Sequence, residues 1–434
     1  MVQHLLVNAK GLANSISSSS FGLNRSWIWV YSKIGWLLAS RATPFLRLLS
    51  SRNVSSFNCM LNTPNTLIPR RQFLATAATV TAFTAFGIIG CKKTINVPKR
   101  SSGIFVGEGT FKYEVINDWA VLPDKYSWQI THNVSVDKDG FLYVIHEGNE
   151  ALPDHPAIFV FDPAGQFVKA FGSQFQGGGH GLEVRVEGNE QFLYVTGYQK
   201  LKTFAKLTLD GEEVWSQKAP LDSGLYAMDE NTKKRFSDRA EFWGRNHFLP
   251  TNFAFLPDGS FFVADGYGAF TIHRFDKDAN YVSSFGGEGT EDGKFKTPHG
   301  LWIDTRGDES LIVVADRANK RLQWFTLEGV HRKTLDGFIL PANIDQFEDT
   351  LLVPDLSTRI TILDKDNNLI HLGEDLEWRK QVTKDKNAMR RGPREKWVSG
   401  KFVHPHDACF ADNGDIYVAE WVATGRISKL LRVT

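Results

Sequence analysis

A motif that recurs six times along the chain is the sequence feature that most constrains its fold. Each copy begins with a polar or small residue, alternates apolar and polar residues into a turn rich in Asp, Asn and Gly, and continues into a second apolar run. The copies start at His132, His180, Thr251, His299, Ala342 and His406. Alternation of period two, broken by such turns, is typical of short antiparallel strands. Because one unit cannot bury its own faces, equivalent units must stack on one another.

The length of the repeat predicts the architecture. Each copy continues into a further pair of strand-like runs, for example 157–161 followed by 166–171, which gives four short strands in roughly 45 residues. Six such units around an axis form an all-β, six-bladed β-propeller. The last copy holds only three strand-like runs, whereas a lone run at 111–119 precedes the first copy. We therefore expect this N-terminal strand to complete the last blade and close the ring.

Two stretches interrupt the repeat. Residues 217–247 lie between the second and third copies, and residues 374–403 lie between the fifth and sixth. Both stretches are polar and rich in charge, so we predict loops over one face of the propeller. Loops of this length either shape a binding site or are merely solvated, and both alternatives stay open.

Charge is divided unevenly along the chain. The 434 residues carry 50 Lys and Arg and 49 Asp and Glu, but residues 1–90 hold eight basic residues and no acidic one. The remainder is mildly acidic, with a net charge of −7. Binding to a nucleic-acid backbone needs clustered Lys and Arg, so we expect no nucleic-acid partner. Three cysteines, two of them in the front segment, exclude a disulfide framework.

The basic front segment resembles an export signal. Adjacent arginines, Arg70 and Arg71, precede an apolar run of small residues at 75–90 that ends directly before Cys91. This order resembles a bacterial twin-arginine signal with a lipoprotein cleavage site, so we expect an exported protein of the bacterial cell envelope or periplasm, anchored through a lipidated Cys91. An uncleaved membrane anchor is one alternative. An organellar transit peptide suits the Arg and Ser content but not this arrangement.

This interpretation divides the chain into four parts. Met60 becomes the more natural start, so that residues 1–59 are an extension without function. Residues 60–91 are the signal, residues 92–110 are a linker, and residues 111–434 are the propeller.

Histidines recur at one register of the repeat. Four copies begin with His, and the first strand of each blade lines the central channel of a propeller. His180, His299 and His406 belong to alternate blades, about 120° apart. Three imidazoles that converge in this way form a natural zinc site with an open position for water or substrate. A single channel histidine is more often a hydrogen-bonded polar residue, and His132, outside the alternation, is interpreted as such a neighbour.

A tyrosine and an arginine complete the candidate site. Tyr267 and Arg317 both follow the second strand of their repeats, so we expect both to overhang one mouth of the channel. A cation beside a phenol favours the phenolate, and a metal does so further, which lets Tyr267 act as a base near neutral pH. The alternatives are a packed turn aromatic for Tyr267 and a surface ion pair with Asp316 for Arg317.

Several of these segments resemble a known family. Residues 250–267, 298–325 and 405–420 (PTNFAFLPDGSFFVADGY, PHGLWID…VVADRANKRLQWF and PHDACFADNGDIYVAE) resemble NHL-repeat propellers. More narrowly, they resemble peptidyl-α-hydroxyglycine α-amidating lyases, and the resemblance covers all six repeats. NHL repeats alone would be weak support, because many such propellers are binding scaffolds.

The resemblance implies specific residues and a reaction. Zinc binds the α-hydroxyglycine end of a peptide, the tyrosine takes the hydroxyl proton, and the N–Cα bond breaks to give a peptide amide and glyoxylate. A calcium ion lies deeper in the channel. The implied residues are His180, His299 and His406 for zinc, Tyr267 and Arg317 for catalysis, and Asp407 with the carbonyl oxygens of Val134 and Leu182 for calcium.

The sequence departs from the family at two positions that we take as candidate substrate-binding residues. The second family arginine is replaced by Glu147, and this reversed charge is expected to weaken capture of a substrate carboxylate. The family methionine before the last zinc histidine is replaced by His404. Since His404 precedes His406 by two residues, it points to the same side of a strand and either touches the pocket rim or is solvated.

Three functions are compatible with these features. The first is a zinc-dependent carbon–nitrogen lyase acting on a small peptide-like substrate. The second is a non-catalytic propeller that binds a peptide, a glycan or another envelope protein. The third, a calcium-dependent lactonase, is disfavoured because such sites rely on carboxylates and Asn more than on histidines.

Overall fold

The computed structural model describes residues 101–149, 151–232 and 244–433 of the chain. The expected export signal, the start at Met60 and the lipidation site at Cys91 lie outside these residues. Within them, no helix is both long enough and apolar enough to span a membrane.

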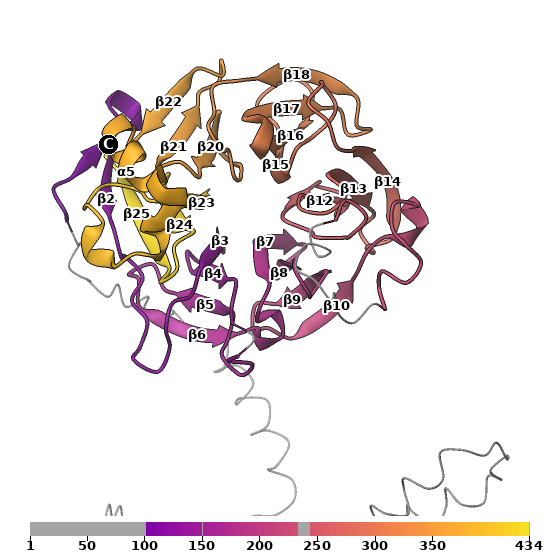
Figure 1. Cartoon of the computed structure of the whole chain (residues 1–434), viewed down its shortest axis with the longest axis horizontal. Helices are drawn as coiled ribbons and strands as arrows, with labels where there is room; N and C mark the ends of the chain where they lie inside the picture. Colours follow the sequence, from indigo (N-terminus) through magenta and orange to yellow (C-terminus); the bar gives the residue numbers. More distant parts are fainter. Residues whose placement is uncertain (1–100, 150, 233–243, 434) are drawn as a thin grey trace, which may run out of the picture. The chain divides into compact units, whose positions relative to one another are not determined.

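Six antiparallel sheets surround a central channel in the described part of the chain (Figure 1). The prediction of an all-β, six-bladed propeller is confirmed. The first three sheets are β3 (Thr131–Val136), β4 (Leu142–His146), β5 (Ile158–Phe161) and β6 (Phe167–Phe171); β7 (Gly179–Glu187), β8 (Glu190–Gly197), β9 (Thr203–Thr208) and β10 (Glu213–Gln217); and β11 (Phe253–Phe255), β12 (Phe261–Asp265), β13 (Thr271–Phe275) and β14 (Tyr281–Gly286).

The remaining sheets complete the ring. They are β15 (Pro298–Asp304), β16 (Leu311–Asp316), β17 (Arg321–Phe325) and β18 (His331–Leu335); β19 (Asp345–Phe347), β20 (Thr350–Asp355), β21 (Arg359–Leu363) and β22 (Leu369–Leu372); and β23 (Pro405–Phe410), β24 (Ile416–Glu420), β25 (Arg426–Arg432), β2 (Tyr113–Ile116) and β1 (Phe105–Val106). Short 3-10 turns connect the strands: η1 (Gly109–Phe111), η2 (Ser173–Phe175), η3 (Leu221–Ser223), η4 (Arg317–Asn319), η5 (Ala388–Arg391) and η6 (Arg394–Lys396).

Strand β2 closes the ring as the sequence predicts. It pairs antiparallel with β25, with Tyr113 opposite Arg432 and Ile116 opposite Lys429. Outside it, the short β1 pairs with β2 and gives the last blade a fifth strand that the sequence analysis did not predict. The beginning and the end of the propeller therefore meet in one sheet, which removes an open sheet edge.

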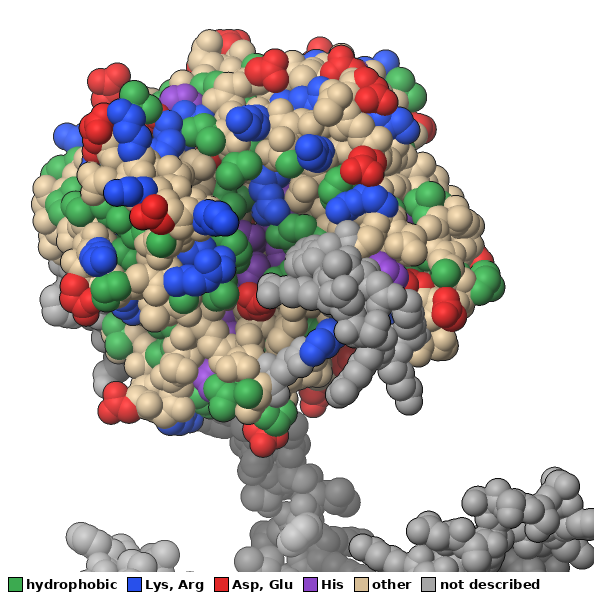
Figure 2. Space-filling view, in the orientation of Figure 1, with side chains coloured by type: hydrophobic (Ala, Val, Ile, Leu, Met, Phe, Trp, Pro, Cys, Tyr) green, Lys and Arg blue, Asp and Glu red, His purple; other side chains and the backbone are tan. Residues whose placement is uncertain are grey.

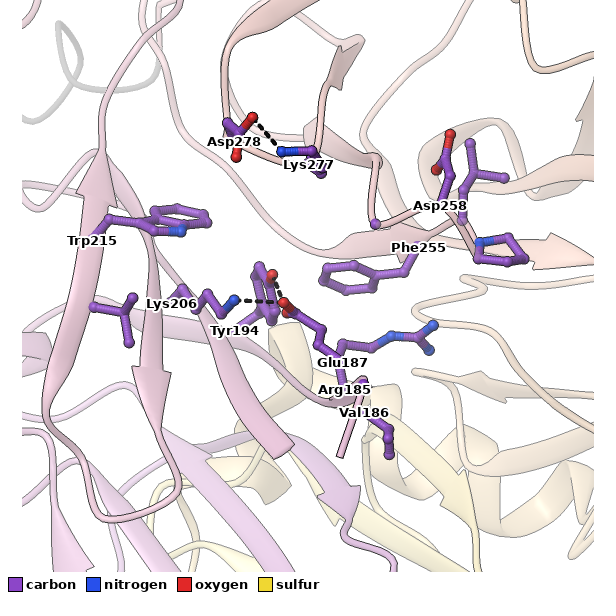
Figure 3. A pocket seen from close by; sticks show the side chains of 15 residues that line it. Arg185, Val186, Glu187, Tyr194, Lys206, Trp215, Phe255, Asp258, Lys277 and Asp278 are labelled. Atoms are coloured by element: carbon purple, nitrogen blue, oxygen red, sulfur yellow. Dashed lines mark hydrogen bonds and ion pairs between the residues drawn. The ribbon is translucent and has the colours of Figure 1, made fainter. Parts of the chain in front are cut away.

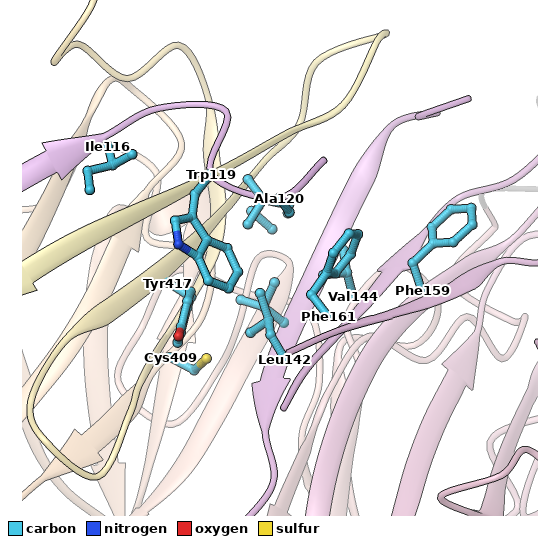
Figure 4. Packing of buried hydrophobic residues seen from close by; sticks show 12 residues of the cluster. Ile116, Trp119, Ala120, Leu142, Val144, Phe159, Phe161, Cys409 and Tyr417 are labelled. Atoms are coloured by element: carbon cyan, nitrogen blue, oxygen red, sulfur yellow. The ribbon is translucent and has the colours of Figure 1, made fainter. Parts of the chain in front are cut away.

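A buried cluster seals the closure between the last blade and the first. Figure 4 shows Trp119, from the segment after β2, next to Tyr417 of β24, and Leu142 of β4 belongs to the same cluster. The ring centroids of Trp119 and Tyr417 lie 4.9 Å apart. Cys409 is a free, buried thiol of the same cluster. Burial of aromatic and aliphatic surface, rather than a cross-link, joins the ends of the ring.

The second interruption of the repeat is not a loop throughout, so that part of the prediction was wrong. Residues Leu376–Asn387 are assigned to helix α5, whose N-cap Asp375 accepts a hydrogen bond from the Trp378 backbone N–H. Trp378 and Val382 are buried against Val403 and Val422. A single N-cap and two apolar anchors are enough to dock an otherwise polar helix.

The closing strand generates a prediction about stability. Val115 of β2 is 1% exposed and packs among the apolar side chains between the last two blades. Replacement of Val115 by alanine leaves a cavity, and we expect the free energy of unfolding to fall by about 2 kcal/mol. Denaturation in urea measures this loss. The control is Val121→Ala at a site that is 50% exposed, and equal stability of the two variants would contradict the role given to β2.

Candidate metal centre

The first residues of the inner strands bring imidazoles to the channel axis. His180 near the start of β7, His299 in β15 and His406 in β23 are all buried. The ring centroids of His180 and His299 lie 4.8 Å apart, and those of His299 and His406 lie 4.7 Å apart. Figure 2 shows histidine atoms within a hollow at the centre of one face, with Lys and Arg side chains around it.

Each of these histidines is fixed by a backbone carbonyl of the following blade. His180 Nδ1 lies 3.0 Å from the Thr251 carbonyl oxygen, His299 Nδ1 lies 2.6 Å from that of Ala342, and His406 Nδ1 lies 2.8 Å from that of His132. A carbonyl only accepts, so each Nδ1 carries the proton. Each Nε2 is then left with a lone pair, which is the tautomer that binds a metal through Nε2.

The Nε2 atoms of His180 and His299 are close enough to share a cation. His180 Nε2 and His299 Nε2 lie 3.1 Å apart, although both present lone pairs in this tautomer. Two nitrogen ligands of a tetrahedral zinc ion lie about 3.3 Å apart, given Zn–N distances of about 2.0 Å. Burial, the largest cause, lowers the pKa of all three imidazoles well below the usual value, and neighbouring positive charges lower it further. They are therefore neutral, as metal ligands must be.

A fourth imidazole belongs to the cluster. The ligand atoms of His132, His180 and His406 all lie within 4.8 Å of one another, and these three residues could hold a metal ion. His132 was interpreted as a polar neighbour, yet neither of its buried ring nitrogens has a hydrogen-bond partner. The structure therefore brings together the three predicted ligands and also His132, which shares their register in the repeat.

Tyr267 lies over the predicted ligands. Its hydroxyl oxygen is 2.9 Å from His299 Nε2 and 3.4 Å from His180 Nε2. The Arg317 guanidinium lies 5.2 Å from the centre of the Tyr267 ring. Asp316, the alternative partner of Arg317, instead accepts a hydrogen bond from Arg321 Nε at 2.8 Å. The predicted tyrosine and arginine thus meet at one mouth of the channel.

The first insertion braces the turn that carries Tyr267. Arg245 Nη1 donates to the carbonyl oxygens of Tyr267, at 3.1 Å, and Gly268, at 2.7 Å. The Arg245 guanidinium also stacks over Phe270, 3.6 Å from the ring centre. At Arg245, therefore, this insertion contacts the turn that carries Tyr267.

Glu147 lies beside His132 rather than in open solvent. Its Oε2 is 3.6 Å from His132 Nε2, and its Oε1 accepts hydrogen bonds from Tyr198, at 3.1 Å, and from the Gln199 amide. These donors and His132 hold the pKa of Glu147 below its usual value despite burial, which acts in the opposite direction and is the largest single cause. Tyr198 was missed, although Gly-Tyr follows the second strand of both the second and the third repeat.

His404 is buried, which excludes the solvated alternative. Its Nδ1 donates to the Leu356 carbonyl oxygen at 2.7 Å, and its Nε2 has no hydrogen-bond partner. The ring lies 6.1 Å from that of Trp421, which directly follows β24.

Buried oxygen atoms lie next to the imidazoles, at Asp407 and Asn133. Asp407 accepts hydrogen bonds from the Val134 backbone N–H, at 2.8 Å, and from Asn343 Nδ2, at 2.5 Å. Burial raises the pKa of Asp407 to about 7. Asn133 Oδ1 is buried without a partner. A carboxylate and amide oxygens in this setting fit a hard cation such as calcium. Leu182 is buried in β7, and the role of its carbonyl oxygen as a calcium ligand stays a prediction.

A cavity of about 610 Å³ opens at the other end of the inner strands, and the sequence analysis did not predict it. Strand β7 begins beside His180 and ends at Glu187, which lines this cavity. Figure 3 shows Lys206 and Tyr194 both directed at Glu187, and each donates to its carboxylate at 2.6 Å. The charged groups of this cavity are largely paired with one another.

The fold and the site together define a six-bladed propeller with a histidine-lined channel that could hold a metal ion. No model of a protein family matches the chain. The chain is 38% identical over 96 residues to peptidyl-glycine alpha-amidating monooxygenase B of Xenopus laevis, which covers 21% of this chain and 10% of that protein. It is 36% identical over 83 residues to the probable peptidyl-alpha-hydroxyglycine alpha-amidating lyase of Caenorhabditis elegans, which covers 18% of this chain and 23% of that protein. The similarity therefore spans less than a quarter of these curated relatives.

Solved structures align with the chain at low sequence identity. A virginiamycin B lyase from Staphylococcus aureus aligns over 74% of this chain and 100% of its own, with 12% identity and a TM-score of 0.45. A gluconolactonase from Xanthomonas campestris aligns over 76% of this chain and 96% of its own, with 9% identity and a TM-score of 0.49. Likenesses of this size carry no argument about activity.

A buried network fixes the first insertion to the third blade. The Tyr226 hydroxyl lies 2.8 Å from Asp265 Oδ2 and 2.6 Å from His273 Nε2. Burial lowers the pKa of His273 to about 3 and raises that of Asp265 to about 6. The same Asp265 accepts hydrogen bonds from the backbone N–H groups of Gly268 and Ala269, in the turn that follows Tyr267.

This network predicts a dependence of stability on pH. An unfolded histidine titrates near pH 6.5, so between about pH 6.5 and pH 3 the unfolded chain holds a proton that folded His273 does not. This group alone lowers the free energy of unfolding by up to about 1.4 kcal/mol for each pH unit of acidification. Asp265 acts in the opposite direction, so the measurement compares variants.

We expect urea denaturation from about pH 7 to pH 4 to show a smaller loss of stability on acidification for His273→Gln than for the unaltered protein. His331→Gln, in the neighbouring blade and closer to solvent, is the matched control. An unchanged pH dependence in His273→Gln would contradict the assignment of a buried neutral imidazole.

Proposed function

We propose that the protein is a zinc-dependent lyase that breaks the N–Cα bond of a peptidyl-α-hydroxyglycine-like substrate. One observation carries this proposal. His180 and His299 each donate Nδ1–H to a backbone carbonyl, so their unprotonated Nε2 atoms face each other, and the Tyr267 hydroxyl lies 2.9 Å from His299 Nε2. The sequence similarity to amidating enzymes supports the same reaction.

The metal and the protein have separate parts in this reaction. Zinc held by His180, His299 and His406 supplies a Lewis acid at the channel axis. His132 lies close enough to serve as an additional ligand or as a polar wall. A calcium ion held by Asp407 would have a structural role, because its positive charge would balance the negative charge of the buried Asp407 carboxylate.

Tyr267 moves the proton. The Arg317 guanidinium lies 5.2 Å from the ring centre, where its positive charge would offset the negative charge of a tyrosinate base. Tyr267 Oη then accepts the hydroxyl proton of the substrate while the carbon–oxygen double bond of glyoxylate forms and the N–Cα bond breaks. The electron pair of that bond goes to the amide nitrogen, which takes up the proton. No oxidant or reductant is consumed.

A non-catalytic propeller that binds a peptide is the second candidate. Glu147 favours it, because this carboxylate lies within the channel site beside His132 and opposes the entry of an anionic substrate. The two candidates differ in metal content and in turnover.

Metal analysis of the purified protein tests the zinc centre. We expect about one zinc ion per chain, and its loss in the double variant His180→Ala/His299→Ala, because the remaining imidazoles supply too few ligands for tight binding. The matched control is His331→Ala in β18, in the same blade as His299. A natively folded protein without metal would exclude the lyase.

Release of glyoxylate from an α-hydroxyglycine peptide tests the chemistry. We expect Tyr267→Phe to retain zinc but to lower kcat by about 10²- to 10⁴-fold, because the base is removed. Tyr281→Phe is the control, since this residue lies in the same blade and its hydroxyl lies 2.9 Å from Ser284 Oγ. Zinc without turnover on such peptides would favour the binding protein instead.

A further inference from the structure

The second insertion places a buried arginine beside the metal centre without an acceptor. Arg390 belongs to η5, is 6% exposed, and its Nε has no hydrogen-bond partner. Within residues 101–149, 151–232 and 244–433, its guanidinium makes no ion pair or hydrogen bond. A buried guanidinium without an anion is costly, because it loses solvation and gains no partner. The structure therefore holds a donor whose acceptor is missing.

The surroundings of Arg390 place it on the channel. Its guanidinium stacks on Trp421, 3.0 Å from the ring centre, and its carbonyl oxygen accepts from the Ala423 backbone N–H at 2.8 Å. Burial is the largest cause of the low pKa of His132 and of His404, and the charge of Arg390 lowers both further. Arg390 thus lies on the wall shared by the last and first blades.

Glu147 does not satisfy Arg390. No ion pair joins them within 4.0 Å in the described residues, because Glu147 is held by Tyr198, Gln199 and His132. Burial lowers the pKa of Arg390 to about 10, and the charge of Glu147 opposes this shift only from beyond ion-pair distance. A positive charge for an incoming ligand is still present, but it comes from the insertion rather than from the first blade.

A second group without a partner lies on the same wall. His404 Nδ1 donates to a carbonyl, so its buried Nε2 is a hydrogen-bond acceptor without a donor. Both this ring and the Arg390 guanidinium lie against Trp421. A planar guanidinium suits a carboxylate, and a neutral imidazole nitrogen suits an N–H group. An acylated amino acid with a free carboxylate offers both groups side by side.

We propose that Arg390, stacked on Trp421, is the carboxylate-binding residue of the channel, and that it selects acylated amino acids with a free C-terminal carboxylate. This inference rests on the proposed function, since it names the part of the substrate that the insertion holds. His404 accepts the N–H group of the same ligand. Arg317 is left to act on Tyr267, since its guanidinium lies 5.2 Å from the centre of that ring.

Binding of non-reacting ligands tests the inference without turnover. Hippurate carries an acylated N–H group and a carboxylate, whereas hippuramide carries a neutral amide in place of the carboxylate. Calorimetry on the zinc-loaded, full-length protein is expected to show tighter binding of hippurate. Arg390→Gln is expected to weaken hippurate binding by about 10- to 100-fold and to leave hippuramide binding unchanged.

Two further variants make the result decisive. Arg391→Gln, at the exposed neighbour in η5, is expected to leave both affinities unchanged. Arg390→Lys keeps the positive charge but lacks the planar guanidinium that binds a carboxylate through two hydrogen bonds, so hippurate binding is expected to weaken. If Arg390→Gln does not fold, this variant tests the inference in its place.

Three results would overturn the inference. The first is an undiminished preference for hippurate in Arg390→Gln or, where that variant does not fold, in Arg390→Lys. The second is a loss of the preference in Arg317→Gln but not in the Arg390 variants, and the third is an unaltered protein that does not prefer hippurate. A protein that prefers hippurate but releases no glyoxylate would overturn the proposed function and leave this inference standing.

Discussion

The hydrogen bond from His406 Nδ1 to the His132 carbonyl oxygen joins the last blade to the first, and the metal centre depends on it. Matching bonds tie His180 to the third blade and His299 to the fifth. Each imidazole is therefore oriented by an acceptor on the blade that follows. Since no blade can orient its own histidine, the ligand set exists only in a closed ring whose inner strands are in register.

Close packing along the axis supports this arrangement. The residues after His180 and His299 are glycines, and a Cβ atom at Gly181 or Gly300 would collide with the Thr251 carbonyl oxygen or with the Asn343 backbone. The bare Cα atoms let the next blade approach closely enough for its carbonyl to accept from Nδ1. Ring closure by Trp119 and Tyr417 and ligand orientation at the axis are thus two results of the same packing.

The fold could be predicted because the strand pattern is local and recurs in six copies along the sequence. Alternation predicts the strands, and the strand missing from the last copy predicts the partner of β25. The error at 376–387 has a physical reason: only Trp378 and Val382 bury apolar surface, so the helix has too little periodicity to be recognised. Strand β1 is two residues long and carries no pattern at all.

The site was predictable only where the repeat determines it. The register of the repeat predicts which residues line the channel. The prediction from alternate blades considered only the angle of each histidine around the axis and not the distance between histidines of adjacent blades. In the narrow channel, the His132 ring lies 4.7 Å from that of His180, so adjacent blades also meet. Arg390 has no equivalent position in any repeat, because it lies in an insertion. Its place is set by Trp421 and by the turn that follows α5, which sequence alone does not define.

The pairing of β2 with β25 has a consequence for biogenesis. Strand β2 precedes the first blade in the chain, but its partner β25 (Arg426–Arg432) belongs to the last blade and is therefore synthesised after all five others. Five blades can form on the ribosome before the ring closes, since domains and their parts fold as the chain emerges. The His406–His132 contact comes last. The histidine cluster that could hold a metal is therefore complete only after the ring closes, and a chain without its last blade lacks this cluster even when the other blades are folded.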